Sequence, residues 1–393
     1  MHKILTLNAI ALKGLEQFPR SQYEVASEIG NPDAIVLRSH KLGEQEITPE
    51  VKAIARAGAG VNNIPLGPCT DRGIVVFNTP GANANAVKEL VLAGLLLGSR
   101  DIAGGMEYVR TLNDITDDRE LNMLLEKEKK RFKGEELVGK TLGVVGLGAI
   151  GSLVAEMGLM LGMKVMGYDP AISVAAAWRL PSNVESMENL PSLVAKADFI
   201  SLHLPVLDST RGLINSELLK HFKPTARLMN FARSEVVDTQ AVAQALEEDR
   251  LGHYITDFPS PELIREPKAI LMPHIGASTL EAEENCAVMA AMQIRDFLEY
   301  GNIKNSVNFP ALALEPSEGY RLAISNRNVP KMLGSILAII SDHDINVIDM
   351  LNKSRDDVAY TLIDIADKPE EALLDEIRGI DGVINVRLIE QPA

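Results

Sequence analysis

Short apolar runs alternate with helical patterns along most of the chain. Two of the apolar runs are residues 34–37 and 74–77. A helical segment is expected near residues 49–53, between these runs, and a long buried helix at residues 86–99. Strands that are apolar throughout, with helices between them, are typical of a parallel sheet that is covered on both faces. The pattern therefore predicts an α/β fold.

A second alternating series begins after the polar and charged segment 114–133. It contains about six strands with helices between them, which is the number in a complete doubly wound dinucleotide-binding domain. The expected strands are residues 141–145, 164–168, 199–204, 228–231, 254–256 and 269–272. A long helix is expected at residues 281–300, and Gly301 stands where a helix commonly ends.

The last part of the chain has a different rhythm. Residues 308–319 are punctuated by Pro, Gly and Ser and predict a linker. The elements after it follow in the order βαββαβ, which is the order of the ferredoxin-like fold. They are strands 320–325, 346–352, 358–366 and 382–389, and helices 330–342 and 369–379.

Composition narrows the class of protein. The 393 residues predict two to four domains, and the 46% apolar share excludes a wholly disordered chain. With 39 basic and 54 acidic residues, the net charge of −15 disfavours a nucleic-acid partner. The basic run 127–133 is interpreted as a solvated helix face.

The two cysteines, Cys69 and Cys286, cannot form a disulfide framework or a CxxC site, and no metal site is expected. Both are expected to be reduced thiols in or near a core. No signal peptide is evident, and the longest apolar segment, residues 90–97, is too short to cross a bilayer. These features predict a cytoplasmic protein with no membrane partner.

A glycine-rich turn predicts a dinucleotide site. The sequence Gly-Leu-Gly-Ala-Ile-Gly, residues 146–151, follows an apolar strand and precedes an apolar helix. Such glycines permit the tight turn, the approach of a pyrophosphate and close packing of helix on strand, while the helix N-terminus attracts the phosphates. Asp169 ends the next strand, where it can accept both ribose hydroxyls and would repel a 2′-phosphate, so NAD is preferred over NADP. The candidate residues are Gly146, Gly148, Ala149, Ile150, Gly151 and Asp169.

Charged and titratable residues follow three later strands of the same series. Arg233 follows one strand, Asp257 and Glu262 follow the next, and His274 follows the last. Oxidation of a hydroxy acid needs a base for the hydroxyl proton, and histidine titrates in the right range. An arginine can hold the substrate carboxylate, and a carboxylate beside the histidine can orient it. Each residue alone would more often be structural, but their placement on successive strand ends favours catalysis.

Five stretches together resemble the D-isomer-specific 2-hydroxy-acid dehydrogenase family. They are residues 56–63, 77–83, 143–151, 230–238 and 273–279. The C-terminal segment resembles an ACT regulatory domain. The resemblance implies that Arg233, Glu262 and His274 are catalytic, with His274 as the acid/base.

The resemblance also implies the architecture. A Rossmann-type NAD domain, residues 100–280, is inserted in a discontinuous flavodoxin-like substrate domain, residues 1–99 and 281–312. A ferredoxin-like ACT domain, residues 318–393, follows, and the active site lies in the cleft of the first two domains. Further residues implied on the nicotinamide side are His203, Leu204, Pro205, Phe231, Ala232, Asp257 and Gly276. Implied substrate ligands are Gly58, Ala59 and Gly60 through a backbone turn, together with Arg233 and His274.

The implied reaction is NAD-dependent oxidation of 3-phospho-D-glycerate to 3-phosphohydroxypyruvate, the first step of phosphorylated L-serine biosynthesis. A phosphorylated substrate needs a further cation, for which Arg56 is the best candidate; the alternative is a solvent-facing arginine at a strand end. Asn326, Asn328 and Asn346 are candidates for binding L-serine as an effector. A homodimer or homotetramer is expected from the family.

Two departures from the family pattern leave alternatives open. Members commonly carry Asp-Val-Phe-Pro-x-Glu-Pro around the catalytic glutamate. An ungapped match from Phe258-Pro259 places Pro261 at the glutamate position, so Glu262 requires a local shift and Asp257 is the alternative. Ser234 also stands where glycine usually follows the catalytic arginine. Other functions to test are a glyoxylate or hydroxypyruvate reductase, another D-2-hydroxy-acid dehydrogenase, and a non-enzymatic NAD-sensing protein.

Overall fold

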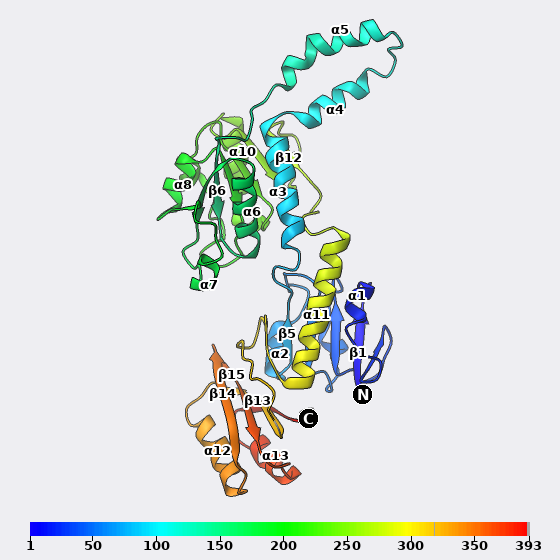
Figure 1. Cartoon of the computed structure of the whole chain (residues 1–393), viewed down its shortest axis with the longest axis vertical. Coiled ribbons are helices and arrows are strands. Elements are labelled where there is room, and N and C mark those ends of the chain that lie inside the picture. Colours follow the sequence, from blue (N-terminus) through cyan, green and yellow to red (C-terminus); the bar gives the residue numbers. More distant parts are fainter. Residues whose placement is uncertain (318, 391–393) are drawn as a thin grey trace. The chain divides into compact units, whose positions relative to one another are not determined.

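The computed structural model describes residues 1–317 and 319–390, which fold as two compact units (Figure 1). The first unit is Met1–Asn83 with Leu280–Ala393, and the second is Ala84–Thr279. Residues 318 and 391–393, at the two ends of the expected C-terminal domain, lie outside the described residues. The division into three domains at the expected bounds stays a prediction.

The first unit begins with a parallel five-stranded sheet in the order β2-β1-β3-β4-β5. This is the flavodoxin-like strand order. The strands are β1 (His2–Leu7), β2 (Tyr23–Ala26), β3 (Ala34–Leu37), β4 (Ala53–Arg56) and β5 (Val75–Phe77). The associated helices are α1 (Leu12–Leu15), η1 (Glu44–Glu46), α2 (Leu66–Asp71) and α11 (Leu280–Tyr300). The long helix α11 packs against β3, β4 and α1, and Gly301, with φ +73°, ends it as expected.

The expected helix near residues 49–53 is wrong. The chain forms a turn there, and β4 begins at Ala53. The Lys52 N–H donates to Asp33 O, and the Val75 N–H donates to Lys52 O, so this segment already belongs to the sheet. The alanines of β4 have weak strand propensity, but the strand is buried and small side chains fit between its neighbours. The edge strand β2 was also not expected.

The C-terminal segment confirms the expected βαββαβ order. Its antiparallel sheet has the strand order β14-β15-β13-β16, which is ferredoxin-like. The elements are β13 (Tyr320–Arg327), α12 (Met332–Asp342), β14 (Val347–Arg355), β15 (Val358–Ile365), α13 (Glu371–Arg378) and β16 (Val383–Glu390). Apolar residues of α12 and α13 share a core with Leu322, Ile324 and Ile363 on one face of the sheet (Figure 1).

The opposite face of this sheet shares a core with the rest of the first unit. Tyr360 and Leu362 join the cluster that contains Phe297 of α11, and the Tyr360 hydroxyl donates to Gly301 O at 2.8 Å. The fully buried Arg321 forms two bonds to Asp364, at 2.6 and 2.8 Å. Its other donors reach main-chain oxygens at the end of α11 and in the linker, namely Tyr300 O, Leu314 O and Glu315 O. All five N–H donors of this guanidinium are therefore satisfied.

The second unit contains a parallel seven-stranded sheet in the order β12-β11-β10-β9-β6-β7-β8. The strands are β6 (Thr141–Val145), β7 (Lys164–Tyr168), β8 (Glu185–Ser186), β9 (Phe199–Leu202), β10 (Arg227–Asn230), β11 (His253–Thr256) and β12 (Ala269–Leu271). Six of them were expected, and the two-residue β8 adds an edge. The strand order reverses between β6 and β9, which is where doubly wound sheets bind ligands.

Helices cover both faces of this sheet. They are α3 (Ala84–Ser99), α6 (Ala149–Met160), α7 (Val174–Ala177), α8 (Leu190–Lys196), α9 (Ser216–Leu219), η3 (Ser234–Val236) and α10 (Thr239–Glu247). Two further helices, α4 (Ile102–Thr111) and α5 (Asp118–Glu128) with η2 (Lys129–Phe132), form an arm that projects from the sheet (Figure 1). The basic run 127–133 lies at the base of this arm, after α5. Its residues Lys129 and Arg131 pair with Glu126 and Glu128 and are exposed, so its interpretation as a solvated face is confirmed.

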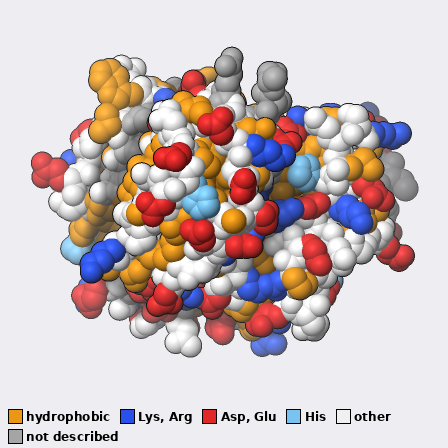
Figure 2. Space-filling model, turned by 90° about the horizontal axis from the view of Figure 1, so that it is seen from below, with side chains coloured by type: hydrophobic (Ala, Val, Ile, Leu, Met, Phe, Trp, Pro, Cys, Tyr) orange, Lys and Arg blue, Asp and Glu red, His pale blue; other side chains and the backbone are white. Residues whose placement is uncertain are grey.

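Both cysteines lie in cores, as expected: each thiol is buried and unpaired. Within the described parts of the chain, no helix is both long enough and apolar enough to cross a membrane. Basic and acidic side chains are interspersed over the face of the molecule that Figure 2 shows.

Candidate active site

The glycine-rich turn joins β6 to α6 and has no room for side chains at two of its glycines. Gly146 has φ +89°, and a Cβ there would lie 2.5 Å from His203 O. A Cβ at Gly151 would lie 1.9 Å from Gly146 O. The space beside Gly148 is open, with nothing within 4 Å of a Cβ. The turn is thus closely packed against β9 and α6 while its middle remains accessible to a ligand.

Asp169 stands directly after β7 and is tied to the same turn. Its Oδ2 accepts a hydrogen bond from the Leu147 N–H at 2.8 Å, and its Oδ1 accepts one from the Ala171 N–H at 3.0 Å. The carboxylate therefore lies beside the glycine-rich turn. The N-terminus of α6, with Ala149 and Ile150 in its first turn, supplies N–H groups that no carbonyl of the helix can accept. These are the groups that the sequence placed around a pyrophosphate and a ribose.

His203 follows β9 at the point where the strand order reverses. Its main-chain N–H donates to Val145 O at 2.8 Å, and its Nε2 lies 2.8 Å from Ser201 Oγ. The Nδ1 atom is buried and has no hydrogen-bond partner. Burial lowers the pKa of His203 to about 3, so this imidazole is neutral at physiological pH. Leu204 is partly buried in the adjacent core, whereas Pro205 is exposed.

Buried Asn230 shapes the chain after β10. Its Oδ1 accepts from the Ala232 N–H at 3.1 Å, and its Nδ2 donates to Arg233 O at 2.9 Å. Phe231 and Ala232 are buried, while Arg233 is half-buried. The Arg233 Nη1 donates to Ala232 O at 2.6 Å, and no carboxylate of the described residues forms an ion pair with this guanidinium. Sequence reasoning gave Asn230 no role, although a buried amide at a strand end is a recognisable turn residue.

Asp257 connects the end of β11 to the loop that holds His274. Its Oδ2 accepts from the Gly276 N–H at 2.8 Å, and its main-chain O accepts from the His274 N–H at 2.8 Å. Asp257 is 1% exposed, and its Oδ1 has no hydrogen-bond partner among the described residues. Burial raises the pKa of Asp257, while the Gly276 N–H and the nearby His274 oppose the shift. His274 itself is exposed and has φ +47°.

The structure does not bring Glu262 to His274. Glu262 is fully exposed, and a hydrogen bond from its own backbone N–H lowers the pKa of its carboxyl group. Among the described residues, no hydrogen bond joins the Glu262 carboxylate to the His274 imidazole. Counted from Asp257, however, Glu262 occupies the glutamate place of Asp-Val-Phe-Pro-x-Glu-Pro without a shift. Asp257, by contrast, is hydrogen-bonded to His274 through its main-chain oxygen.

In the first unit, the turn after β4 presents backbone donors. The carbonyls of Gly58, Ala59 and Gly60 accept hydrogen bonds from Thr79 N, Asn78 Nδ2 and Arg56 Nη1, at 3.0, 2.6 and 2.5 Å respectively. Within the described residues, the N–H groups of Ala59 and Gly60 form no hydrogen bond. A turn whose carbonyls are held on one side leaves its N–H groups available to an anion.

Arg56 lies against this turn. Its Nη1 donates to Gly60 O, and its Nε donates to Arg38 O at 3.0 Å. The would-be Cβ of Gly58 would lie 2.9 Å from the same Nη1. Arg56 is therefore not the solvent-facing residue of the alternative interpretation: it supports the turn that was expected to bind the substrate carboxylate.

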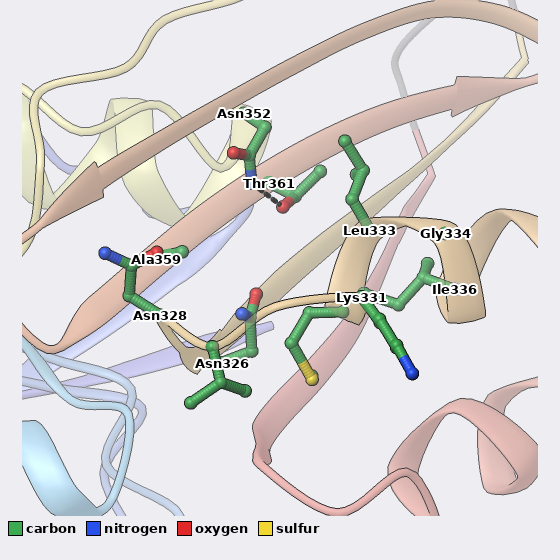
Figure 3. A pocket seen from close by; sticks show the side chains of 11 residues that line it. Asn326, Asn328, Lys331, Leu333, Gly334, Ile336, Asn352, Ala359 and Thr361 are labelled. Carbon is green, nitrogen blue, oxygen red and sulfur yellow. Dashed lines mark hydrogen bonds between the residues drawn. The ribbon is translucent and has the colours of Figure 1, made fainter.

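A pocket of about 220 Å³ lies between β13, β15 and the start of α12 (Figure 3). Asn326 and Asn328 both line it, whereas Asn346 does not. Asn326 is 3% exposed; its Nδ2 donates to Arg327 O at 2.6 Å, and its buried Oδ1 has no hydrogen-bond partner. Lys331, the N-cap residue of α12, has φ +75°. Two of the three expected effector residues thus share one pocket.

These residues fit a nicotinamide dinucleotide. The glycine turn leaves an open space over the N-terminus of α6, and the buried oxygen Oδ1 of Asp257 lacks a donor that a carboxamide could supply. Among the described residues there is no group of three His, Cys, Asp or Glu side chains that could hold a metal ion.

Comparisons with known proteins agree with this arrangement. Residues 102–276 match a family model described as D-isomer specific 2-hydroxyacid dehydrogenase, NAD binding domain. D-3-phosphoglycerate dehydrogenase of Haemophilus influenzae is 32% identical over 367 residues, which are 90% of this chain and 85% of that protein. The enzyme of the same name from Synechocystis sp. is 38% identical over 310 residues, 77% of this chain. The NAD⁺-bound 3-phosphoglycerate dehydrogenase of Entamoeba histolytica has a TM-score of 0.62 at 31% identity, covering 78% of this chain and 98% of that one.

The relatives differ in length. The chain spans 53% of the Synechocystis protein, and 61% of a D-3-phosphoglycerate dehydrogenase of Methanocaldococcus jannaschii that is 32% identical to 84% of this chain.

Proposed function

The chain belongs to the D-isomer-specific 2-hydroxyacid dehydrogenase family, and we propose that it oxidises 3-phospho-D-glycerate to 3-phosphohydroxypyruvate with NAD⁺. The observation that carries the proposal is the grouping of Arg233, Asp257 and His274 at the ends of three neighbouring strands of one sheet that also holds the glycine-rich turn. The names of the Haemophilus and Synechocystis relatives support this choice of substrate.

Each part of the reaction has a residue suited to it. The Arg233 guanidinium, which pairs with no carboxylate of the described residues, can hold the substrate carboxylate with two parallel hydrogen bonds. In the first unit, the N–H groups of Ala59 and Gly60, which form no hydrogen bond within the described residues, can bind an anionic group. His274 removes the proton of the C2 hydroxyl group, and among the described residues no carboxylate is hydrogen-bonded to its ring. NAD⁺, when bound, accepts the hydride from C2.

The carboxylate that assists His274 is a separate part of the proposal. Glu262 remains the proposed catalytic carboxylate by resemblance. Asp257 is supported by its main-chain bond to His274 and by its electrostatic interaction with that residue. Comparison of Glu262→Gln with Asp257→Asn separates the two, because the variant of the orienting residue should lose more kcat.

A substrate panel tests the function. NADH formation is measured by absorbance with 3-phospho-D-glycerate, D-glycerate and D-lactate at equal concentrations. We expect the highest kcat/KM with the phosphorylated acid. Turnover confined to the acids without phosphate would refute the proposal and favour a glyoxylate or hydroxypyruvate reductase. That alternative has one observation in its favour, because Nε and Nη1 of Arg56 donate to main-chain oxygens of the protein.

We further infer that the chain is regulated through its C-terminal segment, the βαββαβ part of the first unit. The βαββαβ topology supports an ACT domain, and the pocket beside Asn326 and Asn328 has amide groups that can bind both the carboxylate and the amine of L-serine. The unpartnered Oδ1 of Asn326 is an acceptor that an ammonium group would satisfy.

We also propose a homodimer or homotetramer, in which the arm contacts a second copy of the chain. Apolar side chains on the arm are exposed, including Met106 at 58%, Val109 at 53% and Met123 at 66%. Exposed apolar patches of this kind mark association surfaces. A cytoplasmic location is proposed because both thiols are unpaired and the proposed substrate is a phosphorylated metabolite.

A further inference from the structure

The imidazole of His274 lies against an aromatic ring. The rings of Phe258 and His274 have centroids 4.8 Å apart and planes inclined by 52°. Among the described residues, no hydrogen bond holds the imidazole nitrogens. Tilted aromatic pairs at this separation attract each other beyond the burial of their surfaces.

Phe258 is itself held in place by the sheet. Its N–H donates to Thr256 Oγ1 at 3.1 Å, and the same hydroxyl donates to Asn230 O on the neighbouring strand at 2.7 Å. Pro259 follows directly, and a residue before proline is restricted to extended backbone. Phe258 is half-buried, and these bonds anchor its main chain to β10 and β11.

Asp257 and Phe258, which follow β11, constrain different parts of His274. Asp257 O accepts the His274 N–H, which fixes the backbone of a residue with φ +47° and therefore the direction of its Cα–Cβ bond. That bond leaves the side-chain torsions free. The ring of Phe258, tilted against the imidazole, is placed to restrict them.

We propose that Phe258 is a positioning residue for His274: its ring holds the imidazole in the orientation from which His274 exchanges the substrate proton. The inference rests on the proposed acid/base role of His274. Phe258 acts through His274 and makes no contact with the reacting atoms. A misplaced base costs rate even when substrate still binds, so the loss should appear in kcat more than in KM.

The test uses Phe258→Leu and Phe258→Tyr. We expect Phe258→Leu to lower kcat by about tenfold with the KM for NAD⁺ unchanged, and Phe258→Tyr to retain most of kcat. A loss of kcat without a change in either KM, and its restoration in Phe258→Tyr, is a pattern that a purely structural role for Phe258 would not produce.

Phe222→Leu is the matched control, since Phe222 is buried in the core of the same unit, away from the strand ends. It should lose stability while keeping kcat. The inference is overturned if Phe258→Leu keeps kcat within twofold of the parent, or if Phe222→Leu reproduces its effects. If Phe258→Leu does not fold, as judged by circular dichroism and NADH binding, Phe258→Met serves the same test with a side chain of similar length.

His274→Asn separates this inference from the proposed function. A near-normal kcat in His274→Asn refutes the acid/base role and removes the basis for the inference with it. A large loss in His274→Asn with an unchanged Phe258→Leu refutes only the role of Phe258.

Discussion

Buried polar residues set the local geometry of the strand ends in the second unit. Asn230 uses both ends of its amide to turn the chain between Phe231 and Arg233. Asp257 uses one carboxylate oxygen and its main-chain carbonyl to hold the loop from His274 to Gly276. Because an unpaired buried polar group costs about 1–3 kcal/mol, these bonds also determine where the neighbouring charged residues can lie.

His203 should make stability depend on pH. Its folded-state pKa, about 3, is below that of an unfolded histidine, so the unfolded chain binds more protons as pH falls from about 6.5. The contribution of this neutral imidazole is fully present above that range and is lost progressively toward pH 3. We therefore expect His203→Gln, which keeps a hydrogen-bonding group near Ser201, to lose less Tm than the parent between pH 7 and pH 5. Thermal unfolding at both pH values checks this; parallel losses would contradict it.

Arg56 should affect substrate binding through the turn that it supports. Its removal frees Gly60 O and Arg38 O, so the N–H groups of Ala59 and Gly60 lose their fixed direction. We expect Arg56→Ala to raise the KM for 3-phospho-D-glycerate and for D-glycerate by similar factors of about ten, with the KM for NAD⁺ unchanged. Steady-state kinetics with both acids is the measurement. A rise confined to the phosphorylated acid would instead show a direct phosphate contact, and Arg72→Ala serves as a control of equal charge.

At the scale of elements, the C-terminal sheet is joined to α11 by packing and by a hydrogen bond from the buried Arg321. Phe297, Phe309, Tyr360 and Leu362 lie in a common core cluster. Arg321 connects β13 to the end of α11 and to the linker. The elements on the two sides of the linker therefore form one packed body in this unit.

Removal of the Arg321 charge should loosen that body. Arg321→Met removes the cation that pairs with the buried Asp364, which keeps its hydrogen bond from Ser317. It also removes the Arg321 donors from three main-chain carbonyls. Breaking a buried pair in this way costs about 3–5 kcal/mol. We expect a lower Tm and faster proteolysis in the linker, residues 308–317, than in Arg378→Met, whose ion pairs are exposed. Equal stability of the two variants would contradict this.

The arm of α4 and α5 has a surface that its own unit does not cover. Its apolar side chains line two grooves, the larger of about 510 Å³. Met106→Glu places a charge in this surface, and we expect it to shift the molecule to smaller assemblies in sedimentation velocity. Lys127→Glu, on the exposed basic run of the same arm, is the control for the change of charge. An unchanged assembly in Met106→Glu would exclude the arm as the contact.

At the scale of the whole molecule, an acidic protein is proposed to bind anionic ligands. A net charge of −15 repels phosphate and carboxylate groups at long range. Local donors must therefore attract them: the N-terminus of α6, Arg233 and the turn after β4. Each of these is a short-range arrangement of N–H groups.

A serine titration tests the proposed regulation. We expect millimolar L-serine to lower the initial rate of the full chain. Asn326→Ala should remove the inhibition while keeping kcat, because Asn326 lies in the C-terminal segment. Asn346→Ala should still respond, since Asn346 does not line the pocket. No effect of serine at millimolar concentration on the parent chain would remove the proposal.

The sequence by itself determined the features that depend on neighbouring residues. The apolar strands of the second unit, the glycine turn at residues 146–151 and the C-terminal βαββαβ order could be recognised because each is a local pattern. The sequence pattern did not reveal β4, because Ala-Ile-Ala-Arg has no strong local preference. This segment is a strand because it pairs with β3 and β5. Tertiary structure alone placed Asp257 against His274, turned Glu262 to solvent, bonded Arg56 to Arg38 O and packed the ring of Phe258 at a tilt against His274. The three contacts join residues 16 to 18 positions apart, and their geometry is decided by packing that a local sequence pattern does not contain.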